Sequence, residues 1–448
     1  MRSSIADMMT PTPVRVPLSD AVTLYAIQTD RFKTARLSIY TVTPADEVQS
    51  PLGTLLFGIL RRGSQKYPRL SLLNRRLDEL YGTTLTLRNF LRGDNHVLSF
   101  TAEMLSDAYT FSGDDGNILE GTMEVMAEML LHPLRDKQGL LRRDTVEAEV
   151  ISMIDGIRAE VNEPRTYAAT KLRQTMCEGE PFGLSLSGSI PLLETVTPEV
   201  VTALLDDRLQ RAHWEVYYVG SELPETVADT FRRCFAGFAP QALSLSVTHP
   251  HFPPASVRRM EEELPVEQGK LCIAWSSGIT DQTPVENRRD DYAAAVVLCE
   301  LLGIMQSSLL FRRVREELGL CYDCDAAWEG KKGILSVTSG IHPKNRAVAE
   351  QAILAVFEDI QAGGLTDEDV ALARISLENS YRQLPDSPAA MESYWFWQTP
   401  EHSVLPESHL QRFLSVTRED IIRVAQMFSL DTVYFLNATC AGEEDEDE

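Results

Sequence analysis

The apolar positions of the chain twice follow a helical spacing that ends at a glycine and gives way to a strand pattern. The first run precedes Gly82 and consists of Leu70, Leu73, Leu77 and Leu80. The second run precedes Gly319 and consists of Phe311, Val314 and Leu318. The residues that follow each glycine, 83–91 and 320–328, favour β-strands. Two copies of the order helix, glycine cap and strand predict a duplicated module.

A threonine at a helix start, followed by a short apolar strand, closes each copy. Thr197 precedes one such helix with a strand over 214–219, and Thr417 precedes the other with a strand over 432–436. Further helical patterns cover 120–131, 142–161, 347–361 and 367–383, the last with Thr366 as its N-cap. The pattern therefore predicts an α+β fold of two similar halves, each a mixed or antiparallel sheet covered by helices, with more helix than strand.

Residues 239–269 interrupt this periodicity with five prolines and a cluster of charges. Such a segment is typical of a linker. We therefore predict an N-terminal half over 1–238, a Pro-rich linker over 239–269, a C-terminal half over 270–440 and an acidic tail over 441–448. The tail contains six consecutive acidic residues, 443–448, and is expected to be a solvated end.

The charge of the chain limits its partners. Lys and Arg number 42 against 66 Asp and Glu, which gives a formal net charge of −24 over 448 residues. Nucleic-acid phosphates need clustered cations, so nucleic acid is excluded as an expected partner. The N-terminal residues lack the apolar run of a signal peptide, and no apolar run approaches the ~20 residues that span a bilayer. We expect a cytoplasmic protein without a membrane partner.

The cysteines and histidines show no metal-site spacing. Seven cysteines, an odd number, indicate a reducing compartment: Cys177, Cys234, Cys272, Cys299, Cys321, Cys324 and Cys440. Cys321 and Cys324 have the spacing of a redox dithiol, but their context indicates a strand, and buried thiols are expected. His249 and His251 lie close together without a third ligand, so we expect them on a solvent-exposed linker.

Common catalytic motifs are missing from the sequence, which has no G-x-S-x-G, P-loop, G-x-G-x-x-G or H-E-x-x-H. Acidic pairs such as Glu147 with Glu149 are too abundant to indicate an acid/base site, and residues at i and i+2 of a helix do not face each other. The aromatic run at 394–397 is expected to be a core helix or a docking face.

Two stretches resemble the insulinase-like (pitrilysin) metallopeptidases. Residues 51–68 and 77–82 are similar to the zinc-motif helix of that family and the segment after it, including Gly63, Tyr67 and Pro68. Residues 303–322 resemble the C-terminal signature, in which an Arg and a Tyr seven residues apart contact the substrate. This resemblance covers nearly the whole chain and implies two halves arranged as a clam shell.

The zinc motif H-x-x-E-H is degenerate in this chain. The resemblance aligns its histidines with Thr54 and Gly58 and its glutamate with Phe57. The third ligand of the family, a glutamate, falls on Asp155 or Gly156. A glycine and a phenylalanine cannot ligate zinc, and a lone hydroxyl is a poor ligand, so we expect no metal and no other cofactor. The apolar stripe of the helix is retained, at Leu52, Leu55, Leu56, Ile59 and Leu60.

Arg315 and Tyr322 match the Arg and Tyr of the signature, so the resemblance implies a substrate-binding role for them. The resemblance also implies a non-catalytic subunit that binds peptide and forms a heterodimer with a zinc-bearing homologous peptidase, or self-associates. Two alternatives stay open. One is an active zinc peptidase with unrecognised ligands, and the other is a peptide-binding or assembly protein that captures chains at a sheet edge.

Overall fold

The computed structural model describes residues 11–110, 117–285, 289–398 and 404–439. Contacts divide the chain into two compact units. The first unit contains the described residues of 1–157, 184–247 and 383–405, and the second contains those of 158–183, 248–382 and 406–448. Each unit therefore includes one short segment from the opposite part of the sequence. The acidic tail and Cys440 lie outside the described residues.

The first unit is built on a six-stranded mixed sheet with the order β1-β2-β6-β3-β5-β4. β2 and β6 are parallel and the other pairs are antiparallel. Its strands are β1 (Val14–Pro17), β2 (Val22–Gln28), β3 (Thr34–Pro44), β4 (Thr84–Arg92), β5 (Asn95–Leu105) and β6 (His213–Gly220). Its helices are α1 (Gln49–Arg62), α2 (Leu70–Glu79), α3 (Ile118–Leu131), α4 (Arg143–Ala159), α6 (Ile190–Glu194), α7 (Pro198–Gln210), α8 (Pro224–Cys234) and α12 (Pro388–Phe396).

The second unit is built on a five-stranded mixed sheet with the order β7-β11-β8-β10-β9, in which only β7 and β11 are parallel. Its strands are β7 (Arg258–Leu264), β8 (Gly269–Ser276), β9 (Cys321–Glu329), β10 (Ile334–Ile341) and β11 (Ser429–Ala438). Its helices are α5 (Pro164–Met176), α9 (Asp291–Cys299), α10 (Arg346–Gln361), α11 (Asp367–Gln383), α13 (Pro406–Ser415) and α14 (Arg418–Ala425), with π-helical segments η5 (Glu300–Ile304) and η6 (Phe311–Glu317).

Short 3₁₀ turns complete the described structure, at η2 (Asp107–Tyr109), η3 (Glu160–Asn162), η4 (Pro181–Gly183), η7 (Pro343–Asn345) and η8 (Leu384–Asp386). None of the helices in the described ranges is both long and apolar enough to cross a membrane.

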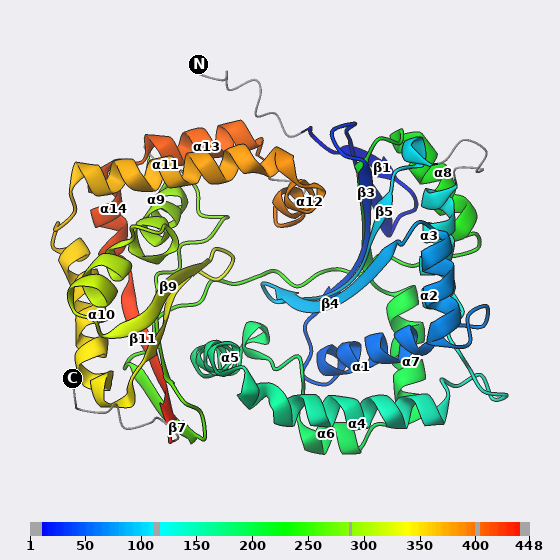
Figure 1. Cartoon of the computed structure of the whole chain (residues 1–448), viewed down its shortest axis with the longest axis horizontal. Helices are drawn as coiled ribbons and strands as arrows, with labels where there is room; N and C mark the ends of the chain where they lie inside the picture. Colours follow the sequence, from blue (N-terminus) through cyan, green and yellow to red (C-terminus); the bar gives the residue numbers. More distant parts are fainter. Residues whose placement is uncertain (1–10, 111–116, 286–288, 399–403, 440–448) are drawn as a thin grey trace, which may run out of the picture. The chain divides into compact units, whose positions relative to one another are not determined.

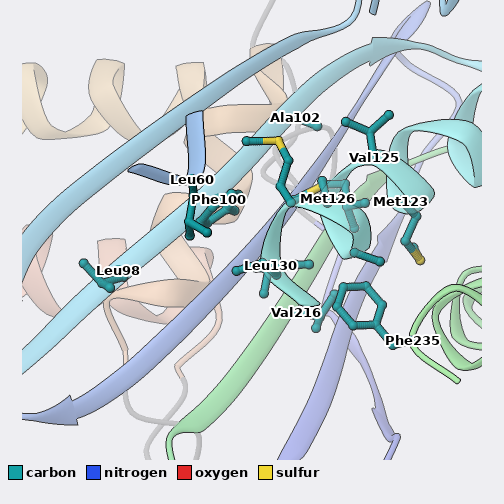
Figure 2. Close-up of a cluster of buried hydrophobic side chains, with 14 of the residues drawn as sticks. Leu60, Leu98, Phe100, Ala102, Met123, Val125, Met126, Leu130, Val216 and Phe235 are labelled. Atoms are coloured by element: carbon teal, nitrogen blue, oxygen red, sulfur yellow. The ribbon is translucent and has the colours of Figure 1, made fainter. Parts of the chain in front are cut away.

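Each sheet has a helix-rich face and a second face covered by one helix from elsewhere in the sequence (Figure 1). In the first unit α1, α3 and α8 pack on one face, and Figure 2 shows part of the core between them and the strands, with Phe100, Met126 and Leu130. α12 covers the opposite face, where Met391, Trp395 and Phe396 are buried. In the second unit α10 lies over one face and α5 contacts β8 and β11.

The predicted repeat is confirmed. α2 leads through Gly82 (φ +74°) into β4, and η6 leads through Gly319 (φ +62°) into β9. Both glycines have the left-handed conformation that favours glycine after a helix. Thr197 and Thr417 cap α7 and α14 as predicted. Thr366 exchanges hydrogen bonds with Asp369 at the start of α11, so the predicted N-cap is confirmed.

The predicted linker is more structured than its composition indicates. β7 begins at Arg258, inside the segment 239–269, and pairs with β11 in parallel. The expectation that His251 is solvent-exposed is wrong, because only 3% of this residue is exposed. The domain boundaries at 238 and 270 stay predictions, and the compact units differ from them by the segments 158–183 and 383–405.

Candidate functional site

α1 contains the three positions that the resemblance aligns with the zinc motif, Thr54, Phe57 and Gly58. Thr54 is the first of them. The Thr54 hydroxyl donates a hydrogen bond to the backbone oxygen of Leu186 at 2.9 Å and accepts a short one from the side-chain amide of Asn89. Both functions of the hydroxyl are therefore used within the first unit. The Thr54 hydroxyl has no remaining proton to donate, and one of the two lone pairs of its oxygen is already used.

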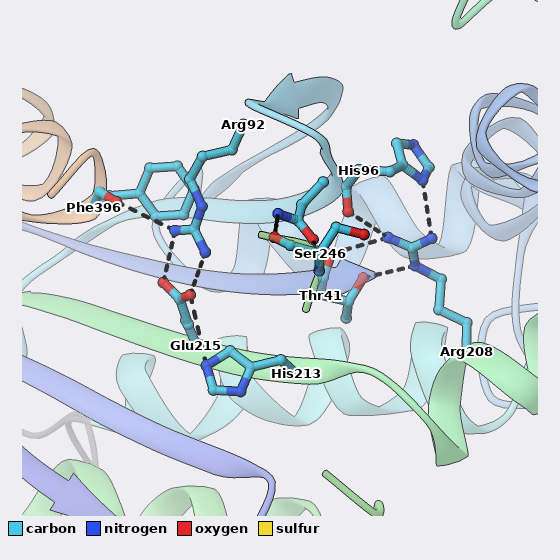
Figure 3. Close-up of polar contacts among 9 residues, drawn as sticks. Thr41, Arg92, His96, Arg208, His213, Glu215, Ser246 and Phe396 are labelled. Carbon is cyan, nitrogen blue, oxygen red and sulfur yellow. Dashed lines mark hydrogen bonds and ion pairs between the residues drawn. The ribbon is translucent and has the colours of Figure 1, made fainter. Parts of the chain in front are cut away.

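A continuous chain of hydrogen bonds leads from Thr54 to a buried arginine. The Oδ1 atom of Asn89 lies 2.5 Å from Nε2 of His96. On the other side of the ring, Nη1 of Arg208 lies 3.1 Å from Nδ1 of His96 (Figure 3). Because arginine can only donate, Nδ1 accepts and Nε2–H donates to Asn89. His96 is then a neutral imidazole, consistent with burial and the Arg208 charge, which lower the pKa of His96 well below its usual value.

Arg208 is buried without a carboxylate partner among the described residues. Its guanidinium donates to the hydroxyl of Thr41 at 3.0 Å and to the backbone oxygen of Thr41 at 2.9 Å (Figure 3). Burial alone lowers the pKa of Arg208 to about 9. The polar groups beneath the motif helix thus form a hydrogen-bonded network that fixes α1, α7, β3 and β4 to one another.

Phe57, at the position of the family's glutamate, is part of the core. It is buried and meets Phe100 edge to face, with ring centroids 5.2 Å apart. The apolar stripe predicted for this helix is confirmed, since its members are all buried: Leu52, Leu55, Leu56, Ile59 and Leu60. Phe57 extends this buried surface, so the position contributes packing and has no acid or base to contribute.

Gly58, at the position of the second histidine, lies directly beneath the carboxylate of Glu149. A Cβ atom built on Gly58 would collide with Oε2 of that side chain. Glu149, on α4, also pairs with Nε of Arg62, one helical turn after Gly58. The guanidinium of Arg62 therefore balances the charge of this carboxylate.

Asp155, which the resemblance offers as a third ligand, lies on the exposed surface of α4. A Cβ atom on its neighbour Gly156 would meet no atom within 4 Å. The carboxylate that lies over the motif helix is instead Glu149, a residue to which the sequence analysis gave no role. The residues present do not fit a zinc ion, because one ion-paired carboxylate and one hydrogen-bonded hydroxyl stand where the site needs two imidazoles and a base.

Within the described parts of the chain, one group of His, Cys and Glu brings three candidate ligand atoms within 4.8 Å of one another: Cys177, Glu180 and His251 of the second unit. His251 lies between two carboxylates, with Nδ1 2.5 Å from Glu180 and Nε2 3.0 Å from Asp431. These bonds raise the pKa of His251 to about 9 against the opposing effect of burial. The imidazole thus carries two protons and leaves no lone pair for a metal.

The other members of this group also have structural partners. Nζ of Lys332, itself buried, lies 2.8 Å from the second carboxylate oxygen of Glu180. Despite burial, the hydrogen bonds and charges of His251 and Lys332 lower the pKa of Glu180 to about 2. Burial raises the pKa of the Cys177 thiol to about 12. We interpret the group as a buried ion-pair cluster that joins the chain before β7 to η4 and β11.

Arg315 and Tyr322 both lie at the surface of the second unit. Arg315 is on η6, where its guanidinium stacks over the ring of Phe311 at 4.8 Å, and it lines a cavity of about 640 Å³. Tyr322 is on β9, against which η6 packs, and 59% of it is exposed. Tyr322 is not among the residues that line this cavity. Neither side chain has a hydrogen-bond or ion-pair partner in the described ranges.

Cys321 and Cys324 flank Tyr322 on β9. Both are buried free thiols, as predicted, and the strand context is confirmed. A hydrogen bond between them lowers the pKa of Cys321 and raises that of Cys324. The six cysteines of the described residues are all free.

Known proteins resemble this chain in both sequence and fold. Residues 195–377 match the family described as Peptidase M16 inactive domain. The chain is 28% identical over 423 residues to the probable inactive metalloprotease YmfF of Bacillus subtilis strain 168, covering 93% of this chain and 96% of that protein.

Two solved structures show the same fold. A conserved protein from Enterococcus faecalis V583 superposes with a TM-score of 0.85 at 22% identity, over 96% of this chain and 100% of that one. The peptidase M16 inactive domain from Pseudomonas fluorescens superposes with a TM-score of 0.74 at 16% identity, over 96% and 99%. The α+β fold with two similar halves is thereby confirmed.

Proposed function

We propose that this chain, which matches the Peptidase M16 inactive domain over residues 195–377 and resembles a probable inactive metalloprotease over most of its length, is a non-catalytic insulinase-like subunit that works in trans. In this proposal it binds peptide and supplies Arg315 and Tyr322 to a zinc-bearing homologous partner. The metal ion and the general base belong to the partner, while this chain contributes substrate contacts.

One contrast between the two units carries the proposal. In the first unit, every degenerate motif position is occupied by the protein's own packing: Thr54 is hydrogen-bonded, Phe57 is in the core and Gly58 lies under Glu149. In the second unit, Arg315 and Tyr322 keep polar groups at the surface without partners among the described residues. Unpaired donors that stay exposed on a folded surface are available to a ligand.

The chemistry of the two side chains suits peptide hydrolysis by a partner. A guanidinium offers a fixed positive fork to a peptide carbonyl or carboxylate, and a phenol offers a hydroxyl donor. Donors aimed at the oxygen that gains charge in the transition state are typically each worth about 10²–10³ in rate. The proposed setting is the cytoplasm, which agrees with the free thiols of the described cysteines.

Co-expression with a zinc-bearing homologous peptidase from the organism that encodes this chain tests this function. We expect the two chains to co-elute in size-exclusion chromatography at a 1:1 ratio, with one zinc per heterodimer and peptide hydrolysis only by the pair. This chain alone should contain less than ~0.1 zinc per molecule and should not cleave peptides. One zinc per isolated chain, lost together with activity on chelation, would contradict the proposal and favour an active enzyme.

The sheet edges favour a second candidate function, a peptide-binding protein without any peptidase partner. β4 and β9 are edge strands, and an edge strand has backbone groups that can accept an extended peptide. Isolation of the chain as a monomer with bound peptide, and without association with a zinc-bearing homologue, would support this candidate over the heterodimer.

A further inference from the structure

A cavity of about 890 Å³ lies in the first unit between α12 and the strands β3, β4 and β5. It lies on the sheet face opposite to the core that contains α1, because α12 packs on that second face (Figure 1). Its volume is in the range of sites that hold small ligands or a few residues of a peptide. Neither the degenerate motif nor the pair Arg315 and Tyr322 accounts for it.

The cavity wall on α12 is held in place by ionic contacts. Glu392, 1% exposed, accepts hydrogen bonds from the hydroxyl of Tyr40 and, at 3.0 Å, from Nε of Arg36. Arg36 also pairs with Glu103 at 2.5 Å. One cation is thus shared between two carboxylates, so Arg36 is not available to a ligand.

A second contact fixes the end of the same helix. Arg92 donates to the backbone oxygen of Phe396 at 3.3 Å and lies over its ring at 4.6 Å (Figure 3). Glu215, which is buried, pairs with Arg92 at 2.6 Å. The cavity therefore has its shape before any ligand arrives, and a preformed site spares a ligand the cost of ordering the wall.

Two side chains of the cavity leave surface that a ligand can reach. Arg88 lies on β4, is exposed, and has no hydrogen-bond or ion-pair partner in the described part of the chain. Trp397 is 43% exposed and contacts Phe90, with ring centroids 5.7 Å apart. Thr86 and Thr101, which pair across β4 and β5, also line the cavity and form the hydroxyl-bearing part of its wall, called here the floor.

The charges of the cavity select among anions. Arg88 is a single unpaired cation among the described residues, while Glu103 and Glu392 both contact Arg36 on the other wall. These two carboxylates disfavour a dianionic phosphate or an acidic segment. A single carboxylate next to an uncharged apolar group meets one free guanidinium and one aromatic wall, and both contacts are favourable.

We propose that this cavity binds the carboxyl-terminal residue of a peptide whose last side chain is aromatic or large and apolar. The α-carboxylate pairs with Arg88, the side chain packs on Phe90 and Trp397, and the hydroxyl groups of the floor bond the preceding amide. This inference rests on the proposed peptide-binding function and specifies the peptide class.

Isothermal titration of the full chain with N-acetyl-Ala-Ala-Phe as the free acid and as the C-terminal amide tests this inference. The acid should bind at least tenfold more tightly, because a charge-assisted hydrogen bond is lost in the amide. Arg88→Gln should remove the difference. Trp397→Ala should weaken both ligands about tenfold and preserve the ratio. The matched control is Arg75→Gln, an arginine 78% exposed on α2, which should change nothing.

The outcomes separate this inference from the proposed function. Equal binding of acid and amide, or a free-acid preference that survives in a folded Arg88→Gln variant, would overturn the inference and leave the proposed subunit role intact. If neither peptide binds, the inference also fails, and co-elution with the zinc-bearing homologue then decides the subunit role independently. Replacement of Phe by Ala in the free acid should weaken binding, and unchanged binding would contradict the aromatic wall.

Discussion

The carboxylate of Glu149 lies so close over Gly58 that no residue with a Cβ atom fits at that position without moving it. The space beside Gly58, which the resemblance aligns with the second histidine of the zinc motif, is therefore filled by a side chain of α4 that is ion-paired with Arg62. The carboxylate would have to move before a larger residue could occupy position 58.

This relationship predicts that Gly58→Ala and Glu149→Ala are strongly coupled. Alanine normally stabilises a helix interior by about 1 kcal/mol over glycine. Beneath Glu149 the added methyl group displaces the carboxylate, so this gain should be absent or reversed, whereas in a Glu149→Ala background it should appear in full. Denaturant titration of the four proteins should give a coupling free energy of at least ~1 kcal/mol.

Gly156→Ala is the matched control, because a Cβ atom there meets nothing within 4 Å. It should stabilise the protein by roughly 0.5–1 kcal/mol in both backgrounds. Additive effects of Gly58→Ala and Glu149→Ala would show that the carboxylate does not occupy this space.

Thr54→Val should destabilise the first unit although valine has nearly the same shape. The substitution leaves the amide of Asn89 and the backbone oxygen of Leu186 without their partner, which typically costs about 1–3 kcal/mol. Thr84→Val, at an exposed position of β4, is the control and should stay within about 0.5 kcal/mol. Equal stability of the Thr54→Val protein would mean that the hydrogen-bonded chain contributes little.

The cluster around His251 predicts a pH dependence of stability. The folded pKa of His251 is raised to about 9, so its contribution is complete below about pH 6.5 and is lost as the pH rises through 9. The folded pKa of Glu180 is lowered to about 2, so its contribution is present above about pH 4.5 and is lost as the pH falls through 2. The cluster should therefore stabilise the protein most between about pH 4.5 and 6.5.

His251→Gln isolates this effect. The free energy of unfolding of the wild type minus that of the variant should fall between pH 6.5 and 9, by at most about 3 kcal/mol. His132→Gln, at an exposed histidine, serves as the control and should show no such slope. A difference that is flat with pH would indicate that His251 is neutral in the folded protein.

Arg315→Ala and Tyr322→Phe should each lower turnover by the reconstituted heterodimer about 10²–10³-fold. Assembly and melting temperature should change little, since both side chains are exposed. Arg382→Ala, an arginine 52% exposed on α11 in the same unit, is the matched control. Full activity of both variants would leave Arg315 and Tyr322 as ordinary surface residues, and loss of assembly would place them in the interface.

Asp155→Asn should leave the activity of the reconstituted pair within a few fold and the stability within about 0.5 kcal/mol. Asp155 is exposed, and no metal charge depends on its carboxylate. A loss of about a hundredfold in turnover with the fold retained would identify Asp155 as a working acid.

The periodicity of the chain predicted the elements well where local signals agree with the tertiary structure. The runs before Gly82 and Gly319 combine apolar spacing with a glycine cap, and both form a helix followed by a strand. The linker was predicted less well, because prolines and charges between 239 and 269 hide a strand whose stability depends on its partner β11. Residues 158–183 belong to the second unit and residues 383–405 to the first, and no local sequence pattern predicts this placement.

The sequence could predict only those site positions that fall within the stretches resembling the family. The resemblance points to Thr54, Phe57 and Gly58, but the residues around them come from β4, β5, α4 and α7, far away in sequence. Gly58 is a glycine inside a helical pattern, and such a glycine can indicate that another side chain packs closely against the helix. The burial of His251 could not be predicted, because the two carboxylates that it contacts, Glu180 and Asp431, are 71 and 180 residues away in the sequence.

Because α12 covers one face of the first sheet, that face cannot be covered until most of the chain has been synthesised. The strands of that sheet have all been translated once β6 ends at Gly220, but the helix that buries Tyr40 and Tyr217 ends at Phe396. At about 5–20 residues per second, the ribosome needs on the order of ten seconds or more to make the intervening chain. During that interval an aromatic sheet face is uncovered on the nascent polypeptide, which makes it a natural client for chaperones that shield apolar surface.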